Sequence, residues 1–268
     1  MNTILITGAA SGIGRETALL FASKGWFSGL CDRDPEGIDS LKKKIDATFG
    51  PDLCCTIPMD VTDPNSVNEG IALFLKKTSG CLDLLFNSAG LLAMGTHDTI
   101  DLPRHRAIVD VNLTGVINLI HACMPALKAT KNAAILTMSS ASAVYGTPEL
   151  ATYSATKHAV RGLTEALNIE FAPYDIHVGD IMVSFVRTPM VTASETQATS
   201  LRRLKAGITP DTVAAAVYKS YFKRRVHRHV GGLLKLLILT CTLAPFAQRF
   251  LVKVLAFSGT PAHPAANR

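Results

Sequence analysis

The feature that most constrains the fold is an alternation of apolar, strand-length runs with stretches of helical period. The runs are apolar throughout, with no polar residue at every second position, which is typical of strands that are buried on both faces. Parallel strands joined by right-handed helical crossovers form a doubly wound sheet. We therefore expect a single α/β domain, a doubly wound parallel sheet with helices on both faces. The predicted strands are 3–7, 26–31, 53–58, 82–86, 133–138 and 176–182, and the predicted helices are 13–24, 35–49, 64–77, 102–129 and 151–171.

Composition supports a folded protein without a metal site. Hydrophobic residues make up 48% of the 268 residues and charged residues 18%, which is enough apolar material for a large core and excludes global disorder. The six cysteines show no C-x-x-C or zinc spacing, and the histidines do not cluster as ligands, so we expect no metal. A strand pattern begins at the N-terminus without a preceding basic region, which predicts no secretory signal and a cytoplasmic protein.

Charge is distributed unevenly along the chain. Residues 1–200 contain 15 Lys and Arg against 20 Asp and Glu, whereas residues 201–268 contain 12 Lys and Arg and a single acidic residue, Asp211. The basic residues adjoin an apolar segment and lack interleaved aromatic residues, so we expect no nucleic-acid partner. A basic, apolar C-terminal region instead indicates contact with a membrane surface or a protein partner.

The first predicted strand leads into a glycine-rich turn, Thr7-Gly-Ala-Ala-Ser-Gly-Ile-Gly14, and then into a helix. Glycine allows backbone to approach a pyrophosphate closely or to take positive φ. The start of the following helix offers free N–H groups and a positive dipole end to phosphates. This strand–turn–helix context predicts dinucleotide binding. The candidate residues are Gly8, Ser11, Gly12, Ile13 and Gly14.

Asp32 ends the second predicted strand, eighteen residues after Gly14. A carboxylate there accepts hydrogen bonds from the adenosine ribose hydroxyls and repels a 2′-phosphate, which favours NAD over NADP. Arg33 and Arg15 are each placed to neutralise a 2′-phosphate, so NADP remains open. Asp60 and Val61 follow the third strand, where the Asp60 side chain is expected to bind the adenine amino group, to cap the next helix, or both.

Three motifs together resemble the short-chain dehydrogenase/reductase family. They are Thr-Gly-x-x-x-Gly-x-Gly at 7–14, Asn87-Ser-Ala-Gly90 and Tyr153-x-x-x-Lys157. The resemblance covers residues 1–230 and implies a Rossmann-like domain, an oxidoreductase acting on CH–OH groups, and a homodimer or homotetramer. Two positions depart from the family pattern. Ser88 replaces an asparagine, which is a small polar exchange. Val183-Ser184 replaces a Pro-Gly pair, so that Ser184 adds a side chain where a glycine would let backbone lie against the nicotinamide.

The resemblance also assigns roles to single residues. Tyr153 is expected to be the catalytic acid/base, Lys157 its activating partner and a cofactor ribose ligand, and Ser140 the hydroxyl that orients the substrate oxygen. Asn112 is expected to anchor a proton-relay water near Lys157. The remaining cofactor-binding residues implied by the resemblance are Asn87, Ala89 and Gly90 at the fourth strand, and Val186 and Thr188 at the nicotinamide end.

The spacing of Tyr153 and Lys157 suits proton transfer. They are four residues apart on one helix and therefore share a face. A free tyrosine has a pKa of about 10 and is a poor base at neutral pH. A nearby ammonium favours the phenolate, so we expect Lys157 to lower the pKa of Tyr153.

An apolar secondary alcohol or ketone is the predicted substrate, because sizeable apolar residues dominate the expected pocket. Those residues are Leu92, Met94, Ala141, Ala143, Leu150, Val183 and Met190. The family architecture implies that the polar segment 190–208 forms a lid over this pocket. Thr209 and Pro210 are expected to begin the next helix.

The apolar, basic segment 231–268 is predicted to be a helical extension, divided by Pro245. We expect it to pack on the substrate pocket or a partner subunit, to lie on a membrane surface through residues 231–257, or to span the membrane. Lys235 and Pro245 make it a poor span. Its apolar residues recur at helical spacing: Leu236, Leu239, Leu243, Phe246, Phe250 and Val254.

Three functional hypotheses remain from the sequence. The leading one is an NAD-dependent oxidoreductase of an apolar secondary alcohol or ketone, with Tyr153 as acid/base. The second is an NADPH-dependent carbonyl or 3-oxoacyl reductase, which a comparison of the two cofactors would distinguish. The third is a non-enzymatic nucleotide-sensing or membrane-associated protein of the same fold, and the intact set Ser140, Tyr153 and Lys157 argues against it.

Overall fold

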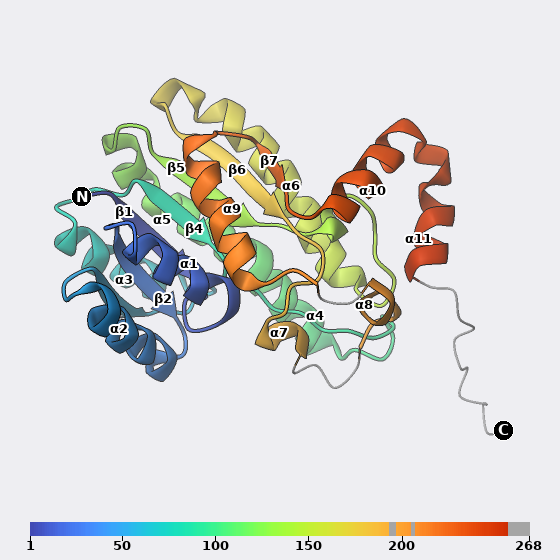
Figure 1. Cartoon of the computed structure of the whole chain (residues 1–268), viewed down its shortest axis with the longest axis horizontal. Coiled ribbons are helices and arrows are strands. Elements are labelled where there is room, and N and C mark those ends of the chain that lie inside the picture. Colours follow the sequence, from blue (N-terminus) through green and yellow to red (C-terminus); the bar gives the residue numbers. More distant parts are fainter. Residues whose placement is uncertain (193–196, 205–206, 257–268) are drawn as a thin grey trace.

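A computed structural model describes residues 1–192, 197–204 and 207–256, and its centre is a seven-stranded parallel sheet (Figure 1). The strand order is β3-β2-β1-β4-β5-β6-β7, so the chain reverses its direction of winding between β1 and β4. In such sheets, ligands bind where the order reverses, beyond the carboxyl ends of the strands. The strands are β1 Thr3–Thr7, β2 Phe27–Asp32, β3 Cys54–Pro58, β4 Leu84–Asn87, β5 Ala134–Met138, β6 His177–Met182 and β7 His227–His229.

Helices cover both faces of the sheet, which confirms the predicted doubly wound architecture (Figure 1). On one face, Phe21, Ile38 and Val213 pack into a common core. On the other face, Phe74, Leu119 and partly buried Leu163 belong to a second core. The first layer contains α1 Gly12–Ala22, α2 Pro35–Phe49 and α9 Pro210–Phe222, and the second contains α3 Pro64–Lys77, α5 Gly115–Ala129 and α6 Ala151–Glu170.

Asp–Pro pairs set the starts of two helices. Asp34 and Asp63 each accept a hydrogen bond from a backbone N–H in the first turn, and a proline follows each of them. Proline suits this position because its missing N–H would have no partner inside the helix. Asp63 is therefore the cap of α3, and the expectation that Asp60 caps this helix is wrong.

The predicted helix 102–129 consists of two α-helices joined by a π-helical turn. These are α4 Leu102–Val109, the turn Asp110–Thr114, and α5. The stretch Leu102–Ala129 is long and apolar enough to cross a membrane by length and composition alone. Buried residues of α5 nevertheless pack on the sheet, so α5 is a core helix.

The C-terminal helices α10 Gly232–Leu243 and α11 Gln248–Ala256 project from one end of the sheet as a helical hairpin (Figure 1). A 3₁₀ turn at Pro245–Ala247 joins them, at the predicted break. The predicted apolar stripe points outward, with Leu239 55% and Phe246 89% exposed, because Leu234 and Ile238 form the packed face instead.

The predicted lid contains two short helices, α7 Pro189–Thr192 and α8 Thr199–Leu204. Its residues 193–196 and 205–206 lie outside the described part of the chain, as do residues 257–268 of the predicted extension. Thr209 precedes α9 in extended conformation and Pro210 begins that helix, as predicted.

Candidate active site

The turn after β1 is a backbone cradle that excludes side chains. Gly8 has a φ of 70°, and a Cβ there would lie 2.9 Å from the backbone of Ala89. A Cβ on Gly14 would lie 2.1 Å from the carbonyl oxygen of Gly8. The hydroxyl of Thr7 accepts hydrogen bonds from the N–H groups of Ser88 and Ala89, which ties the ends of β1 and β4 together. This cradle places the N-terminus of α1 at the edge of the sheet.

A cleft of about 630 Å³ opens beside this cradle, at the reversal point of the strand order. Its dimensions, its glycine walls and the adjoining helix N-terminus fit a dinucleotide, and the cleft residues would hold its phosphates at α1 and its adenosine toward β2 and β3. Most of the predicted cofactor residues line it: Gly8, Ser11, Gly12, Ile13, Asp32, Arg33, Asp60, Val61, Ala89, Gly90 and Thr188.

Asp32 lies half-buried at the end of β2, in the wall of the cleft. Its two carboxylate oxygens accept hydrogen bonds from the N–H groups of Ala10 (3.0 Å) and Asp34 (3.1 Å), which fix the side chain while leaving lone pairs on both oxygens. Arg33 also lines the cleft and is exposed, whereas Arg15 is not among the lining residues. Of the two cations considered for a 2′-phosphate, the structure therefore places only Arg33 in the cleft.

Five predicted cofactor residues do not line the cleft. Tyr153, Lys157 and Val186 line a second cavity beside it, whereas Gly14 and Asn87 line neither. Gly14 is buried under the turn, where its role is close packing on Gly8. Asn87 is 2% exposed, and its Nδ2 donates a hydrogen bond to the hydroxyl of Thr137. Within the described residues, its Oδ1 has no hydrogen-bond partner. The position of Asn87 therefore fits a link between β4 and β5 rather than a side-chain contact with the cofactor.

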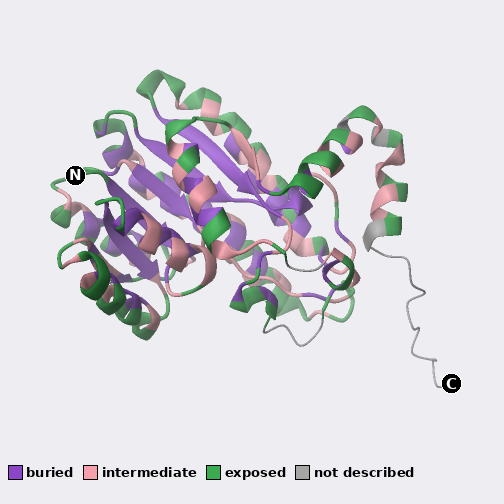
Figure 2. Cartoon of the chain, in the orientation of Figure 1, coloured by how far each residue is buried: buried purple, intermediate pink, exposed green. Residues whose placement is uncertain are grey.

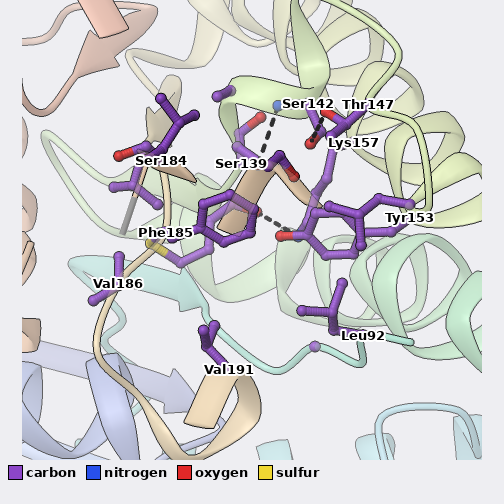
Figure 3. Close-up of a pocket in the computed structure, with 18 of the residues that line it drawn as sticks. Leu92, Ser139, Ser142, Thr147, Tyr153, Lys157, Ser184, Phe185, Val186 and Val191 are labelled. Carbon is purple, nitrogen blue, oxygen red and sulfur yellow. Dashed lines mark hydrogen bonds between the residues drawn. The ribbon is translucent and has the colours of Figure 1, made fainter. Parts of the chain in front are cut away.

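Ser140, Tyr153 and Lys157 meet where β5 ends and α6 begins. The Ser140 hydroxyl accepts a hydrogen bond from the N–H of Ser142 and is hydrogen-bonded to the Tyr153 phenol. The Nζ of Lys157 lies 5.5 Å from the centre of the Tyr153 ring. The side chains of Tyr153 and Lys157 lie at the same cavity wall (Figure 3). The sequence-predicted trio is thus assembled, with the tyrosine phenol in reach of a substrate oxygen.

Burial has a larger effect on the pKa values of Tyr153 and Lys157 than the attraction between the two side chains. Burial raises the pKa of Tyr153, and the Ser140 hydrogen bond opposes that effect. Burial lowers the pKa of Lys157 to about 8, and the nearby Asp180 carboxylate opposes that effect. The expectation that Lys157 lowers the pKa of Tyr153 is therefore not met in this structure, because the lysine Nζ is directed to the carbonyl oxygen of Met138 at 2.8 Å.

Asn112 lies fully buried in the π-helical turn, close to this centre. Its amide exchanges two hydrogen bonds with the backbone of Leu91, and its Nδ2 also lies 3.3 Å from the Thr156 hydroxyl. The side chain therefore fixes the loop after β4 against α6. Its predicted role in anchoring a relay water stays a prediction.

A second, apolar cavity of about 120 Å³ adjoins the cofactor cleft and contains Tyr153 in its wall. Tyr153, Phe185 and Leu92 point into it from different elements (Figure 3). Of the predicted pocket residues, five line this cavity: Leu92, Ala141, Leu150, Val183 and Met190. Met94 and Ala143 are wrong predictions, because both are buried in neighbouring apolar clusters.

Several lining residues were missed by the sequence analysis. Val186 and Thr188, by contrast, were predicted for the nicotinamide end; both line this cavity, and Thr188 also lines the cleft. Helices α10 and α11 form a further wall of the cavity. The apolar character of this segment was the sequence feature from which its lining residues could have been predicted. The lining residues without a predicted role are Ser88, Met138, Ser139, Ser142, Tyr145, Thr147, Ser184, Phe185, Val191, Ser200, Leu204, Leu237, Cys241, Leu251 and Val252.

No group of three metal-ligating side chains occurs in the described part of the chain. The two adjoining cavities, one suited to a dinucleotide and one apolar with a titratable centre, are typical of an enzyme that transfers hydride between a nicotinamide and a carbon centre. Comparison with known proteins agrees with this class.

A model of the short chain dehydrogenase family matches residues 2–199. The chain is similar to 3-oxoacyl-[acyl-carrier-protein] reductase FabG of Thermotoga maritima, with 34% identity over 80% of this chain and 87% of the relative. It is also similar to cyclohexanol dehydrogenase of an Acinetobacter species, with 31% identity over 71% of this chain and 75% of the relative.

Among solved structures, a 3-ketoacyl-(acyl-carrier-protein) reductase of Brucella melitensis complexed with NADH superposes with a TM-score of 0.75. It is 27% identical, and the match covers 85% of this chain and 96% of that one. The chain therefore belongs to the short-chain dehydrogenase family. It is an oxidoreductase that acts on alcohol or carbonyl groups with NAD or NADP.

Proposed function

We propose that this enzyme interconverts an apolar secondary alcohol and its ketone, with NAD as the preferred cofactor and Tyr153 as the acid/base. The observation that carries the proposal is the apolar cavity whose wall contains both the Tyr153 phenol and the Ser140 hydroxyl, next to the dinucleotide cleft. An alcohol oxygen held by these two hydroxyls would present its carbon toward the cleft. The bound nicotinamide cofactor supplies the hydride acceptor or donor.

Proton transfer is the part of the reaction that this chain performs. In oxidation, the Tyr153 oxygen takes the hydroxyl proton of the alcohol, and in reduction it returns that proton to the carbonyl oxygen. Ser140 donates to or accepts from the same substrate oxygen and so fixes its direction. In the proposed mechanism, the Lys157 ammonium, which lies 5.5 Å from the ring centre and is bonded to the Met138 carbonyl in this structure, turns toward the phenolate and stabilises its charge. A buried ammonium acts more strongly on a phenolate than an exposed one, because the surroundings screen it less.

The preference for NAD rests on Asp32. Its carboxylate is held in the cleft wall by two backbone N–H groups, in a position to accept ribose hydroxyls and to repel a 2′-phosphate. Arg33 favours NADP instead, because it lines the same cleft and its positive charge would attract a 2′-phosphate. Fluorescence titration with NADH and with NADPH tests the balance. Tighter NADH binding supports the role of Asp32, and tighter NADPH binding overturns the preference.

Reduction of a 3-oxoacyl thioester is the second candidate, favoured by the 34% identity to a 3-oxoacyl-[acyl-carrier-protein] reductase. The two candidates differ in substrate shape, since a thioester carries a long polar arm and cyclohexanol does not. Turnover of cyclohexanol and longer secondary alcohols with NAD⁺ is to be compared with reduction of a 3-oxoacyl thioester. A faster thioester reaction would overturn the leading proposal.

Tyr153→Phe tests the mechanism in either case. The variant keeps the ring in the cavity wall and removes only the phenolic oxygen, so we expect cofactor binding to persist while kcat falls about 10²–10⁴-fold, as for loss of a general acid or base. Tyr174→Phe is the matched control, because Tyr174 is 48% exposed on the surface and lines neither cavity. Normal turnover by Tyr153→Phe would refute the assigned role.

A further inference from the structure

Many residues of the α10–α11 hairpin are exposed (Figure 2), and its outward face carries large apolar side chains. Its large side chains are mostly more than half exposed: Leu236 60%, Leu239 55%, Leu243 74%, Phe246 89% and Phe250 67%. Single exposed apolar residues are common on soluble proteins, but a contiguous row on adjacent helices marks a docking surface. The two helices project from the end of the molecule, so this surface is open to a flat partner (Figure 1).

The opposite face of the same hairpin forms part of the substrate cavity. Leu237 and Cys241 of α10, and Leu251 and Val252 of α11, line the cavity beside the active-site residues. The hairpin is attached to the body by hydrogen bonds from Gln248 to the carbonyl of Val144 and from α8 to the end of α11. One thin layer of two helices therefore separates the apolar cavity from the exposed apolar surface.

Charge on the hairpin selects the partner. Lys235, Arg249 and Lys253 are exposed on it, and no acidic residue occurs after Asp211 in the sequence. Apolar side chains next to lysines and arginines are typical of helices that lie in the interface of an anionic bilayer. A two-fold contact with a second copy would instead bring equal positive charges together, because each copy presents the same patch.

The length of the helices excludes a span as the mode of contact. Helix α10 has 12 residues, and at about 1.5 Å per residue it is about 18 Å long, against about 30 Å of hydrocarbon in a bilayer. A helix of this length can lie in the interface, but it is too short to cross the hydrocarbon core.

We propose that the α10–α11 hairpin docks this enzyme on an anionic lipid bilayer, and that the substrate enters the cavity from the bilayer through this helical layer. The substrate class is then an alcohol or ketone dissolved in the acyl chains. The entry step rests on the proposed function, whereas docking does not.

Vesicle sedimentation tests docking on the full-length protein. Vesicles of phosphatidylcholine with about 30% phosphatidylglycerol are compared with pure phosphatidylcholine. We expect the protein to sediment with the anionic vesicles and at least fivefold less with the neutral ones, and high salt to release it. A failure to sediment with anionic vesicles would overturn the proposal.

The variant Phe246→Ser/Phe250→Ser removes two outward rings that do not line the cavity. We expect its bound fraction to fall at least fivefold. The matched control Leu73→Ser/Ile169→Ser removes two equally exposed side chains, 58% and 76%, from α3 and α6, and should bind as the wild type does. Equal loss in both double variants would overturn the assignment of the surface. So would a change of oligomeric state confined to Phe246→Ser/Phe250→Ser in sedimentation without lipid, because the patch would then be a self-interface.

Charge is tested by Lys235→Ala/Arg249→Ala/Lys253→Ala against the control Lys24→Ala/Lys43→Ala/Lys44→Ala, since both remove three exposed positive charges. Only the first should weaken binding to anionic vesicles. Equal weakening by both variants would mean that net charge, and not the hairpin, causes the binding.

Substrate entry is tested with two alcohols. With a water-soluble one such as cyclohexanol, Phe246→Ser/Phe250→Ser should match the wild type in kcat/KM. With a long-chain secondary alcohol dissolved in anionic vesicles, its rate should fall at least fivefold. Equal rates for the long-chain alcohol would overturn entry from the bilayer. Vesicle binding without turnover of either alcohol would overturn the proposed function and leave docking intact.

Discussion

Replacing Lys157 by methionine should stabilise the protein at neutral pH while it abolishes activity. Lys157 is 5% exposed, and burial lowers its pKa from 10.5 to about 8. At about 1.4 kcal/mol per pKa unit, this shift means that holding the ammonium in the folded state costs about 3 kcal/mol at pH 7. Methionine has similar length and no charge, so Lys157→Met removes this cost and loses about 1 kcal/mol from the hydrogen bond to Met138.

The sign of the pH dependence follows from the direction of the shift. The folded-state pKa lies below the unfolded value, so the unfolded chain binds more protons between about pH 8 and 10.5 and wild-type stability rises with pH in that window. The cost is fully present below about pH 8 and disappears by about pH 10.5. We expect Lys157→Met to be about 2 kcal/mol more stable than wild type at pH 7, and this advantage to fall by about 3 kcal/mol by pH 10.5.

Urea unfolding without cofactor measures this difference. Trp26, the single tryptophan, is buried against Phe21 and reports on the core by its fluorescence. The same pair of measurements in a Tyr153→Phe background removes any contribution from the neighbouring phenol, and Lys24→Met, which removes an exposed lysine, is the matched control. If Lys157→Met is less stable than wild type at pH 7, or if its effect does not change between pH 7 and 10.5, the reasoning is refuted.

Four further substitutions test single positions. Asp32→Asn should weaken NADH about 10–100-fold and reduce the preference over NADPH, because it removes a charged hydrogen-bond acceptor in the cleft; an unchanged ratio in fluorescence titration would contradict this. Gly14→Ala places a Cβ 2.1 Å from the Gly8 carbonyl oxygen and should prevent folding or cofactor binding. Gly162→Ala, in open space on α6, should instead raise stability by about 0.5–1 kcal/mol in thermal unfolding. His227→Gln should destabilise the protein more at pH 6 than at pH 9, because the hydrogen bond to Asp180 raises the pKa of His227. The stability that this bond adds is present below the unfolded-state pKa of the histidine and is lost as pH rises through its folded-state pKa. A loss that is equal at both pH values would contradict it.

Local sequence determined much of the architecture. The apolar runs from 3–7 to 176–182 agree with six observed strands to within two residues at each end. All but the edge strand β3 are almost fully buried, and turn residues bound the runs. The position of Tyr153 one turn before Lys157 was also readable, since helical spacing alone brings them to one face. The glycine turn could also be predicted from the sequence, because contacts within the turn and with Ala89 leave no room for side chains there.

The orientation of side chains and the pKa of Lys157 could not be predicted from the sequence, because both depend on contacts between residues that are distant in the sequence. The hairpin α10–α11 is apolar on two faces, so helical period alone does not decide which face packs; Leu234 and Ile238 pack on the body and Leu239 does not. The π-helical turn at Asp110–Thr114 adds no signal to the apolar period, although it sets where Asn112 points. The pKa of Lys157 depends on the depth of its burial, which no spacing reveals.

Asp180 provides the last prediction, because it limits how far burial lowers the pKa of Lys157. This carboxylate lies fully buried on β6, and its charge raises the pKa of the lysine. Its Oδ1 is hydrogen-bonded to Nδ1 of His227 at 3.1 Å, and Nε2 of His227 lies 3.0 Å from Glu165 near the surface. Among the described residues, Asp180 Oδ2 has no hydrogen-bond partner. The carboxylate is therefore hydrogen-bonded to His227 through Oδ1 only, and its negative charge stabilises the ammonium of Lys157.

Asp180→Asn should therefore move the pKa of Lys157 below about 8, because it removes the opposing charge and leaves the burial. In this background, the stability advantage of Lys157→Met at pH 7 should be larger, and the midpoint of its fall between the folded-state and unfolded-state pKa values should shift downward. Glu170→Gln, an exposed acidic position on the same helix as Lys157, is the matched control and should not shift it. An unchanged midpoint in Asp180→Asn would mean that His227 and the surrounding backbone, rather than Asp180, set the field at the lysine. A downward shift would show that a residue outside all the family motifs tunes the charge beside the catalytic tyrosine.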